Sequence, residues 1–123
     1  MKEVNKINLA DKLKQIPDFW NPRIVSELNG QQVKLAKFKG KFDWHHHDHE
    51  DEFFLVISGS FEMHLQDKVI TLNPGECISI PRGVVHKPVA PVEAEVLLFE
   101  PASTINTGNL ENSERTRTDL ERL

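Results

Sequence analysis

Apolar and polar residues alternate over short stretches in the middle of the chain, from about residue 23 to about residue 100. Phe61, Met63 and Leu65, for example, are separated by the polar residues Glu62 and His64. A period of two is typical of a strand that buries one face. The segments with strand character are 24–28, 31–38, 53–58, 61–65, 69–72, 77–80, 84–89 and 95–99. Short, closely spaced strands predict an all-β, antiparallel sandwich or barrel.

Residues that favour tight turns separate these segments. Asn29-Gly30 is the strongest hairpin signal, because both central residues of a type I′ turn adopt positive φ. Asn73-Pro74-Gly75 and Pro81-Arg82-Gly83 mark two further turns. The turn residues therefore predict where neighbouring strands end.

A short helix is predicted before the strands. Leu9, Leu13 and Ile16 lie at helical spacing and would form one apolar stripe. Asn8 is a suitable N-cap, and Pro17 ends the helix. We therefore divide the chain into an N-terminal helical extension (1–22), a β-domain (23–100) and a polar C-terminal tail (101–123), whose residues 113–123 have weak helical character.

Length and charge restrict the class of protein. The 123 residues suit one domain with a single core. The net charge is −4 and the lysines are scattered, so neither the charge nor its distribution favours a nucleic-acid partner. No apolar run approaches the roughly 20 residues that span a bilayer, and the N-terminus lacks the apolar stretch of a secretory signal. With Cys77 as the single cysteine, we expect a cytoplasmic protein without an intramolecular disulfide or a membrane partner.

Four of the six histidines lie in one run, Trp44 to Glu52. Side chains alternate along a strand, so His45 and His47 point the same way and His46 points away. Glu52 has the wrong parity for that face, but it returns near His47 on the neighbouring strand if residues 48–51 form a hairpin loop. Two imidazoles and a carboxylate suit a first-row divalent metal.

The same residues match the first motif of the cupin superfamily, G-x5-H-x-H-x3,4-E-x6-G. Gly40, His45, His47, Glu52 and Gly59 stand at the motif positions. The sequence departs only in the first gap, which has four residues instead of five. This difference affects a turn and not a ligand.

The second cupin motif, G-x5-P-x-G-x2-H-x3-N, is matched by Gly75, Pro81, Gly83 and His86. Ala90 replaces the final Asn, which is not a metal ligand in the family. Several fixed positions in order argue against an adventitious histidine run. The chain thus resembles small stand-alone cupins, which are often labelled mannose-6-phosphate isomerase-like, although that label describes the ancestry of the barrel.

The resemblance implies a double-stranded β-helix, or jelly-roll barrel, with one divalent transition metal inside one end. His45, His47, Glu52 and His86 are the implied ligands. Iron, manganese or nickel is the expected metal, with zinc as a further candidate. The coordination positions that remain would admit a small-molecule substrate or dioxygen.

The other polar residues of interest have more ordinary expectations. By parity or by their place in the loop, His46 and His49 face away from the site. His64 is equally consistent with a place in the lining and with a place on the surface. Cys77 is expected to be a buried small residue, and Arg82 an exposed turn residue that could steer an acidic substrate.

Three classes of function remain open. The first is a metalloenzyme acting on a small molecule, with dioxygenase-type chemistry, in which Glu52 stays bound or acts as a base. The second is a non-redox isomerase, epimerase or lyase that uses the metal as a Lewis acid. Its acid or base would be His64, Glu62 or Lys34. The third is a non-catalytic cupin that binds or senses a small molecule.

Some strand segments are apolar on both faces. Phe53, Leu55 and Ile57 lie on the face opposite Phe54 and Val56. Burial of both faces predicts a homodimer.

Overall fold

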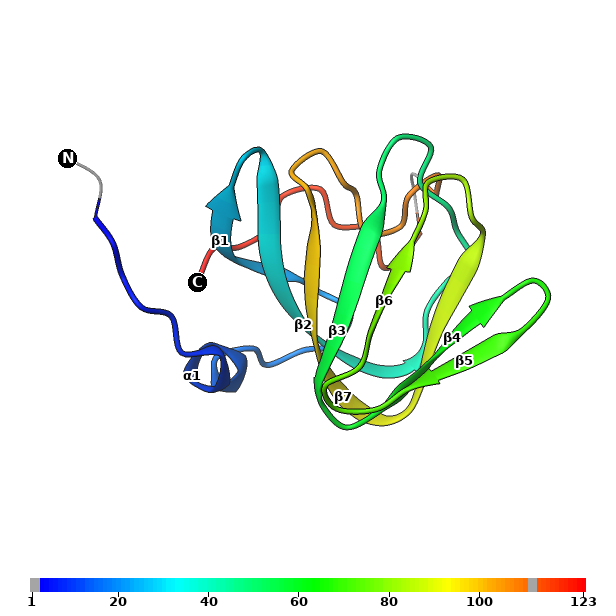
Figure 1. Ribbon diagram of the computed structural model, residues 1–123, viewed down its shortest axis with the longest axis horizontal. Coiled ribbons are helices and arrows are strands. Elements are labelled where there is room, and N and C mark those ends of the chain that lie inside the picture. Colours follow the sequence, from blue (N-terminus) through cyan, green and yellow to red (C-terminus); the bar gives the residue numbers. More distant parts are fainter. Residues whose placement is uncertain (1–2, 111–112) are drawn as a thin grey trace.

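The computed structural model describes residues 3–110 and 113–123. It contains one short helix and one seven-stranded sheet, folded into a barrel (Figure 1). The elements are α1 (Leu9–Lys14), β1 (Arg23–Leu28), β2 (Gln31–Lys41), β3 (Glu52–Ser58), β4 (Phe61–Leu65), β5 (Val69–Leu72), β6 (Cys77–Ile80) and β7 (His86–Pro101). The predicted all-β jelly-roll barrel with a short N-terminal helix is confirmed.

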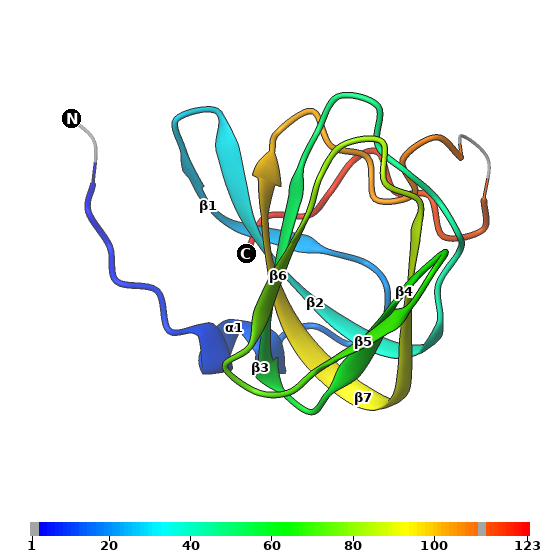
Figure 2. The ribbon, with the colours of Figure 1, turned by 45° about the vertical axis from the view of Figure 1, so that its right-hand side comes forward.

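All strand pairs are antiparallel, and the order in the sheet is β1-β2-β7-β3-β6. The strand β4 pairs with β5 and with the beginning of β7. The two segments expected at 84–89 and 95–99 are thus parts of one strand of 16 residues. This strand bends because its two halves pair with different neighbours, β4 first and β3 later (Figure 2).

Tight turns connect the strands where the sequence predicts them. Asn29 and Gly30 join β1 to β2, and both have positive φ, as a type I′ turn requires. Asn8 caps α1 by accepting a hydrogen bond from the Asp11 backbone N–H. The helix is shorter than its apolar stripe, because Ile16 lies beyond its last turn.

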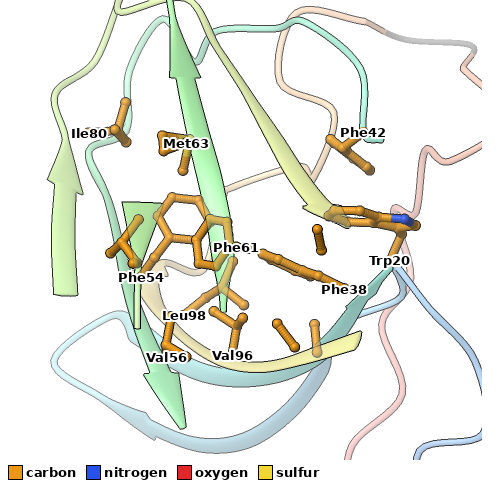
Figure 3. Packing of buried hydrophobic residues seen from close by; sticks show 14 residues of the cluster. Trp20, Phe38, Phe42, Phe54, Val56, Phe61, Met63, Ile80, Val96 and Leu98 are labelled. Atoms are coloured by element: carbon orange, nitrogen blue, oxygen red, sulfur yellow. The ribbon is translucent and has the colours of Figure 1, made fainter. Parts of the chain in front are cut away.

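Inward-facing side chains form an apolar core inside the barrel (Figure 3). Phe38 is its centre: the Trp20 ring stacks on it at 4.4 Å, and the Phe61 ring meets it edge-on at 5.2 Å. Aromatic pairs in these orientations stabilise a core beyond the area they bury. A second cluster, made of Leu13, Ile16, Val25 and Leu35, packs α1 against the outer face of β1 and β2.

The C-terminal residues cross one end of the barrel and return to its side (Figure 2). The helical turns considered for residues 113–123 do not form there. Instead, Leu123 donates a backbone hydrogen bond to Ile24, beside β1. The backbone of the tail thus has a hydrogen-bond partner without forming a helix. The polar sequence of the tail does not favour a helix.

The helix α1, with six residues, is too short to cross a membrane, and no described helix is long and apolar enough to do so.

Gly59, in the turn between β3 and β4, permits a close approach of two backbones. Its φ is +72°, and a Cβ atom added there would lie 2.2 Å from the Glu93 carbonyl oxygen. Gly75 has a similar φ of +82°, but a Cβ atom there would meet nothing within 4 Å. The two glycines therefore separate the cost of backbone conformation from the cost of a clash.

We expect Gly59→Ala to destabilise the fold much more than Gly75→Ala. Both substitutions force alanine into the left-handed region, at about 1 kcal/mol. Gly59→Ala must also displace the backbone at Glu93, which adds about 1–3 kcal/mol. Urea unfolding of the two variants measures the difference. Equal losses would show that the contact with Glu93 is unimportant.

Candidate metal centre

The four predicted ligands converge at the polar end of the barrel. His45 and His47 lie on the segment 42–51, Glu52 begins β3, and His86 begins β7. Backbone hydrogen bonds join the two motifs: His45 and His86 each donate to the other's carbonyl, at 3.0 and 2.9 Å. Gly83 also donates to the His47 carbonyl at 2.8 Å. The turn before His86 is thereby fixed against the histidine run.

Glu52 reaches this cluster by a different route from the predicted one. The segment 42–51 does not pair with β3 as a hairpin, and it makes a single bridge, His45 to His86. The reason is that both edges of β3 are already occupied: Leu55 pairs with Cys77 in β6 and with Leu97 in β7. The inward face shared by Glu52, Phe54 and Val56 is as predicted, since all three are buried.

The ligand atoms of the four residues all lie within 4.8 Å of one another. Glu52 Oε1 is central, at 2.7 Å from His47 Nε2 and 3.1 Å from His86 Nε2. No ligand side chain is more than 4% exposed. Three imidazoles and one carboxylate therefore face a common point inside the barrel.

Hydrogen bonds to the backbone orient two of the imidazoles. His45 Nδ1 lies 2.8 Å from the Asp43 carbonyl oxygen, and His86 Nδ1 lies 2.9 Å from that of Val84. A carbonyl only accepts, so each Nδ1 carries the proton and each Nε2 keeps a lone pair directed at the centre. This is the usual arrangement around metal-binding histidines.

His47 provides the test of whether a metal fits. Its Nε2 is close to Glu52, but neither of its ring nitrogens makes a hydrogen bond within the described residues. Buried polar atoms rarely lack partners. A divalent ion between Nε2 and Glu52 would supply one, and Glu50, 4.0 Å from Nδ1, lies on the other side of the ring. The cluster is suited to a divalent metal ion.

The electrostatics of the cluster also suit a cation. Burial, together with the neighbouring His86 ring, lowers the pKa of His45 to about 4. Burial by itself would raise the pKa of Glu52, but its contacts with His47 and His86 outweigh this and hold it well below its ordinary value. Neutral imidazoles beside an ionised carboxylate are the forms that bind metals.

Residues 25–100 match the family model described as the cupin domain. This match covers more than half of the chain and both histidine motifs. The chain belongs to the cupin family.

The cupin relatives include proteins of known structure. A cupin-2 domain containing protein from Shewanella frigidimarina is 42% identical, with a TM-score of 0.76 over 77% of this chain and 93% of that one. An uncharacterised protein from Bacillus subtilis, YdbB, is 41% identical over 64 residues, which are 51% of this chain and 57% of that protein. Acireductone dioxygenase 1 from Nocardia farcinica is 40% identical over 58 residues, 44% of this chain and 31% of the enzyme. The alignments thus span only about half and a third of these two curated relatives.

The other histidines of the cupin lie outside the centre. His46 turns away, and its Nε2 lies 3.1 Å from Asp48 on the same loop. His49 is exposed. His64 lies on β4 with its Nε2 2.9 Å from Glu62, on the face opposite the buried Met63. His64 and Glu62 therefore do not reach the ligands as an acid or base.

Two further predicted residues are on the surface. Cys77 is exposed, contrary to the expectation of a buried residue, because it faces outward on the edge strand β6. Arg82 is exposed and pairs with Asp51, 3.5 Å away, so it ties its turn to the loop 48–51. Its charge is thus already paired beside that loop.

A small cavity adjoins the cupin metal centre. Its free volume is about 30 Å³, room for about two water molecules. Apolar side chains form most of its wall, and among them are the aromatic residues Trp20, Phe38, Phe42 and Phe54, which Figure 3 labels. Its polar groups include His45 and Glu52, together with Glu100 and Asn106. Groups of about the size of water can thus lie next to these four side chains.

Glu100 and Asn106 are the lining residues that sequence reasoning missed. Glu100 had a signal, since it continues the inward alternation of Val96 and Leu98 on β7. Burial, then the charge of Glu52, raises its pKa well above the ordinary value. Asn106 belongs to the C-terminal tail, where no periodic pattern predicts its direction.

We expect His86→Ala to abolish stoichiometric metal binding, whereas His46→Ala should leave it unchanged. Loss of even an outer partner of a metal ligand costs about 10–100-fold in affinity, so loss of a ligand should cost at least as much. Elemental analysis of tag-free protein, purified anaerobically, gives the metal content of both variants and the parent. Equal metal content in the two variants would contradict the assignment of His86.

Proposed function

We propose that this cupin is a metalloenzyme that acts on a small molecule with dioxygenase-type chemistry. The observation that carries the proposal is the position of the cavity, which adjoins His45 and Glu52 directly. The similarity to the Nocardia farcinica acireductone dioxygenase supports it, over the 58 aligned residues. The metal we favour is iron, manganese or nickel.

When bound, such an ion supplies a Lewis acid and a redox-active centre with positions free for small ligands. The protein's own side chains would hold the ion and surround it. Backbone carbonyls orient His45 and His86, His47 lies beside Glu52, and Glu52 offers the negative charge among the four side chains. Trp20, Phe38, Phe42 and Phe54 give the adjoining space an apolar wall, and electrostatic interactions are stronger beside such a wall than in water.

Lewis-acid chemistry without oxygen is the second candidate, as in an isomerase, epimerase or lyase. It needs an acid or base near the ligands. Of the residues considered from the sequence, Lys34 is inside the barrel, where its Nζ bonds Glu100, while His64 and Glu62 lie on the other face of β4. The pair of Lys34 and Glu100 is the observation that favours this candidate over the non-catalytic binding or sensing cupin.

Oxygen consumption distinguishes these candidates. The test adds small oxygenated metabolites one at a time from a panel. We expect at least one of them to cause oxygen uptake by the iron(II)-loaded protein and none to cause uptake by the zinc-loaded protein. Turnover by the zinc form without oxygen would instead indicate the Lewis-acid enzyme. The His86→Ala variant, treated in the same way, controls for free iron in solution.

We also propose that the protein is a cytoplasmic homodimer. Part of the outer apolar face is covered within the chain, since Ile57, Leu97 and Val33 pack against the cluster beneath α1. Phe53 and Leu55, also on the outer face of β3, are only half-buried and belong to neither core cluster. A second copy packed there would cover them.

Light scattering at micromolar concentration tests the dimer. We expect a mass of two chains for the parent and of one chain for Leu55→Glu, because the substitution places a charge in the apolar contact. A parent protein of one chain's mass would contradict the dimer.

A further inference from the structure

A buried ion pair adjoins the metal centre on the side of the cavity. Lys34 and Glu100 lie diagonally across the pairing of β2 and β7, in which Lys34 is opposite Leu98. Lys34 Nζ donates to Glu100 Oε1 at 2.8 Å, and each side chain is 2% exposed. Both side chains point into the barrel.

Folding alone gives no reason for charges at these positions. The next inward residues on the same two strands, Ala36, Phe38, Val96 and Leu98, are apolar core residues. Replacing a buried ion pair with apolar side chains of similar size often leaves stability unchanged or raises it. The pair therefore interrupts an apolar pattern at the point where the strands reach the metal ligands.

One oxygen of the pair is left for another partner. Glu100 Oε1 accepts from Lys34, whereas Oε2 is buried and has no donor among the described residues, and the Glu52 carboxylate lies beside the Glu100 carboxyl group. Glu100 also lines the cavity together with His45 and Glu52. A buried oxygen without a partner, at the edge of a cavity, is a place where a bound molecule gains a hydrogen bond.

We propose that the pair of Lys34 and Glu100 is a binding subsite for a hydroxyl group of the small molecule that the metal centre binds. This inference rests on the proposed function, since the molecule would place one oxygen on the metal and its hydroxyl group on Glu100. Lys34 acts as the positioning residue, because it holds Oε1 and so fixes the direction of Oε2. The ligand class is a small hydroxy acid or hydroxycarbonyl compound.

The test compares two small probes, one of which has a methyl group in place of the hydroxyl hydrogen of the other. Glycolate and methoxyacetate both carry a carboxylate and a second oxygen, but only glycolate can donate to Glu100. Titration of the cobalt(II)-loaded protein, followed by its visible absorption, gives the two dissociation constants. We expect the parent to bind glycolate about tenfold more tightly than methoxyacetate, the effect of one hydrogen bond.

The double variant Lys34→Met, Glu100→Met removes the subsite while filling the same space. We expect it to bind cobalt(II) stoichiometrically, to melt at or above the temperature of the parent, and to lose the tenfold preference. Glu95→Gln is the matched control: it lies on the outer side of the same strand, bonded to Ser58, and should keep the preference. A double variant that keeps the preference, with metal bound, overturns the subsite.

A second variant serves if the double variant does not fold. Glu100→Gln keeps the size of the side chain and an oxygen for Lys34, but it directs an NH₂ group towards the cavity, which cannot accept from the probe. We expect it to lose the preference as well, and an unchanged preference overturns the subsite.

Azide separates this inference from the proposed function. Azide should change the absorption of the cobalt(II)-loaded parent if the metal has a free position. If azide has no effect, the metal is fully caged by the protein, and both proposals are wrong. If azide binds while the glycolate preference does not depend on Glu100, only the subsite is wrong.

Discussion

The pairing of β7 with three other strands is the constraint on which the barrel and its site depend. Its backbone hydrogen-bonds to β2 along most of its length, to β4 near its beginning and to β3 near its end. Because side chains alternate along a strand, β7 points both His86, its first residue, and Glu100, near its last, into the interior. The bend of β7 brings both residues to the polar end of the barrel, where each contacts Glu52 or its surroundings.

The interior of the barrel changes character along its strands. On β3 the inward residues run from Glu52 to Phe54 and Val56, and on β2 from Lys34 to Phe38. The apolar end stabilises the fold by burial, whereas the polar end costs free energy unless every charge has a partner. The backbone carbonyls of Asp43 and Val84 supply partners for two histidines, and an ion would supply the rest. The apolar core and the candidate site thus adjoin each other inside one barrel.

The surroundings of the site also explain why it is held in shape without a regular strand at residues 42–51. The loop is fastened from several directions: Asp51 accepts from the Arg82 backbone N–H, Ser103 donates to Glu50, and Asn109 exchanges hydrogen bonds with the His46 backbone. Two of these partners belong to the C-terminal tail. A polar tail that has no helical or strand pattern of its own therefore contributes to positioning the metal ligands.

The sequence by itself determined the class of fold and the turns, because alternation and turn chemistry are local properties of the chain, and its resemblance to the cupin motifs indicated the four candidate ligands. Asn29-Gly30 forms its hairpin turn, and His45, His47, Glu52 and His86 meet as the resemblance implies. Only the tertiary structure decided which strands are neighbours. It placed β3 between β6 and β7, so that Glu52 returns to His47 without a hairpin, and it left Cys77 exposed on an edge. It also joined Lys34 to Glu100, 66 residues apart, since the partner of a buried charge depends on strand register across the sheet, which no local pattern encodes.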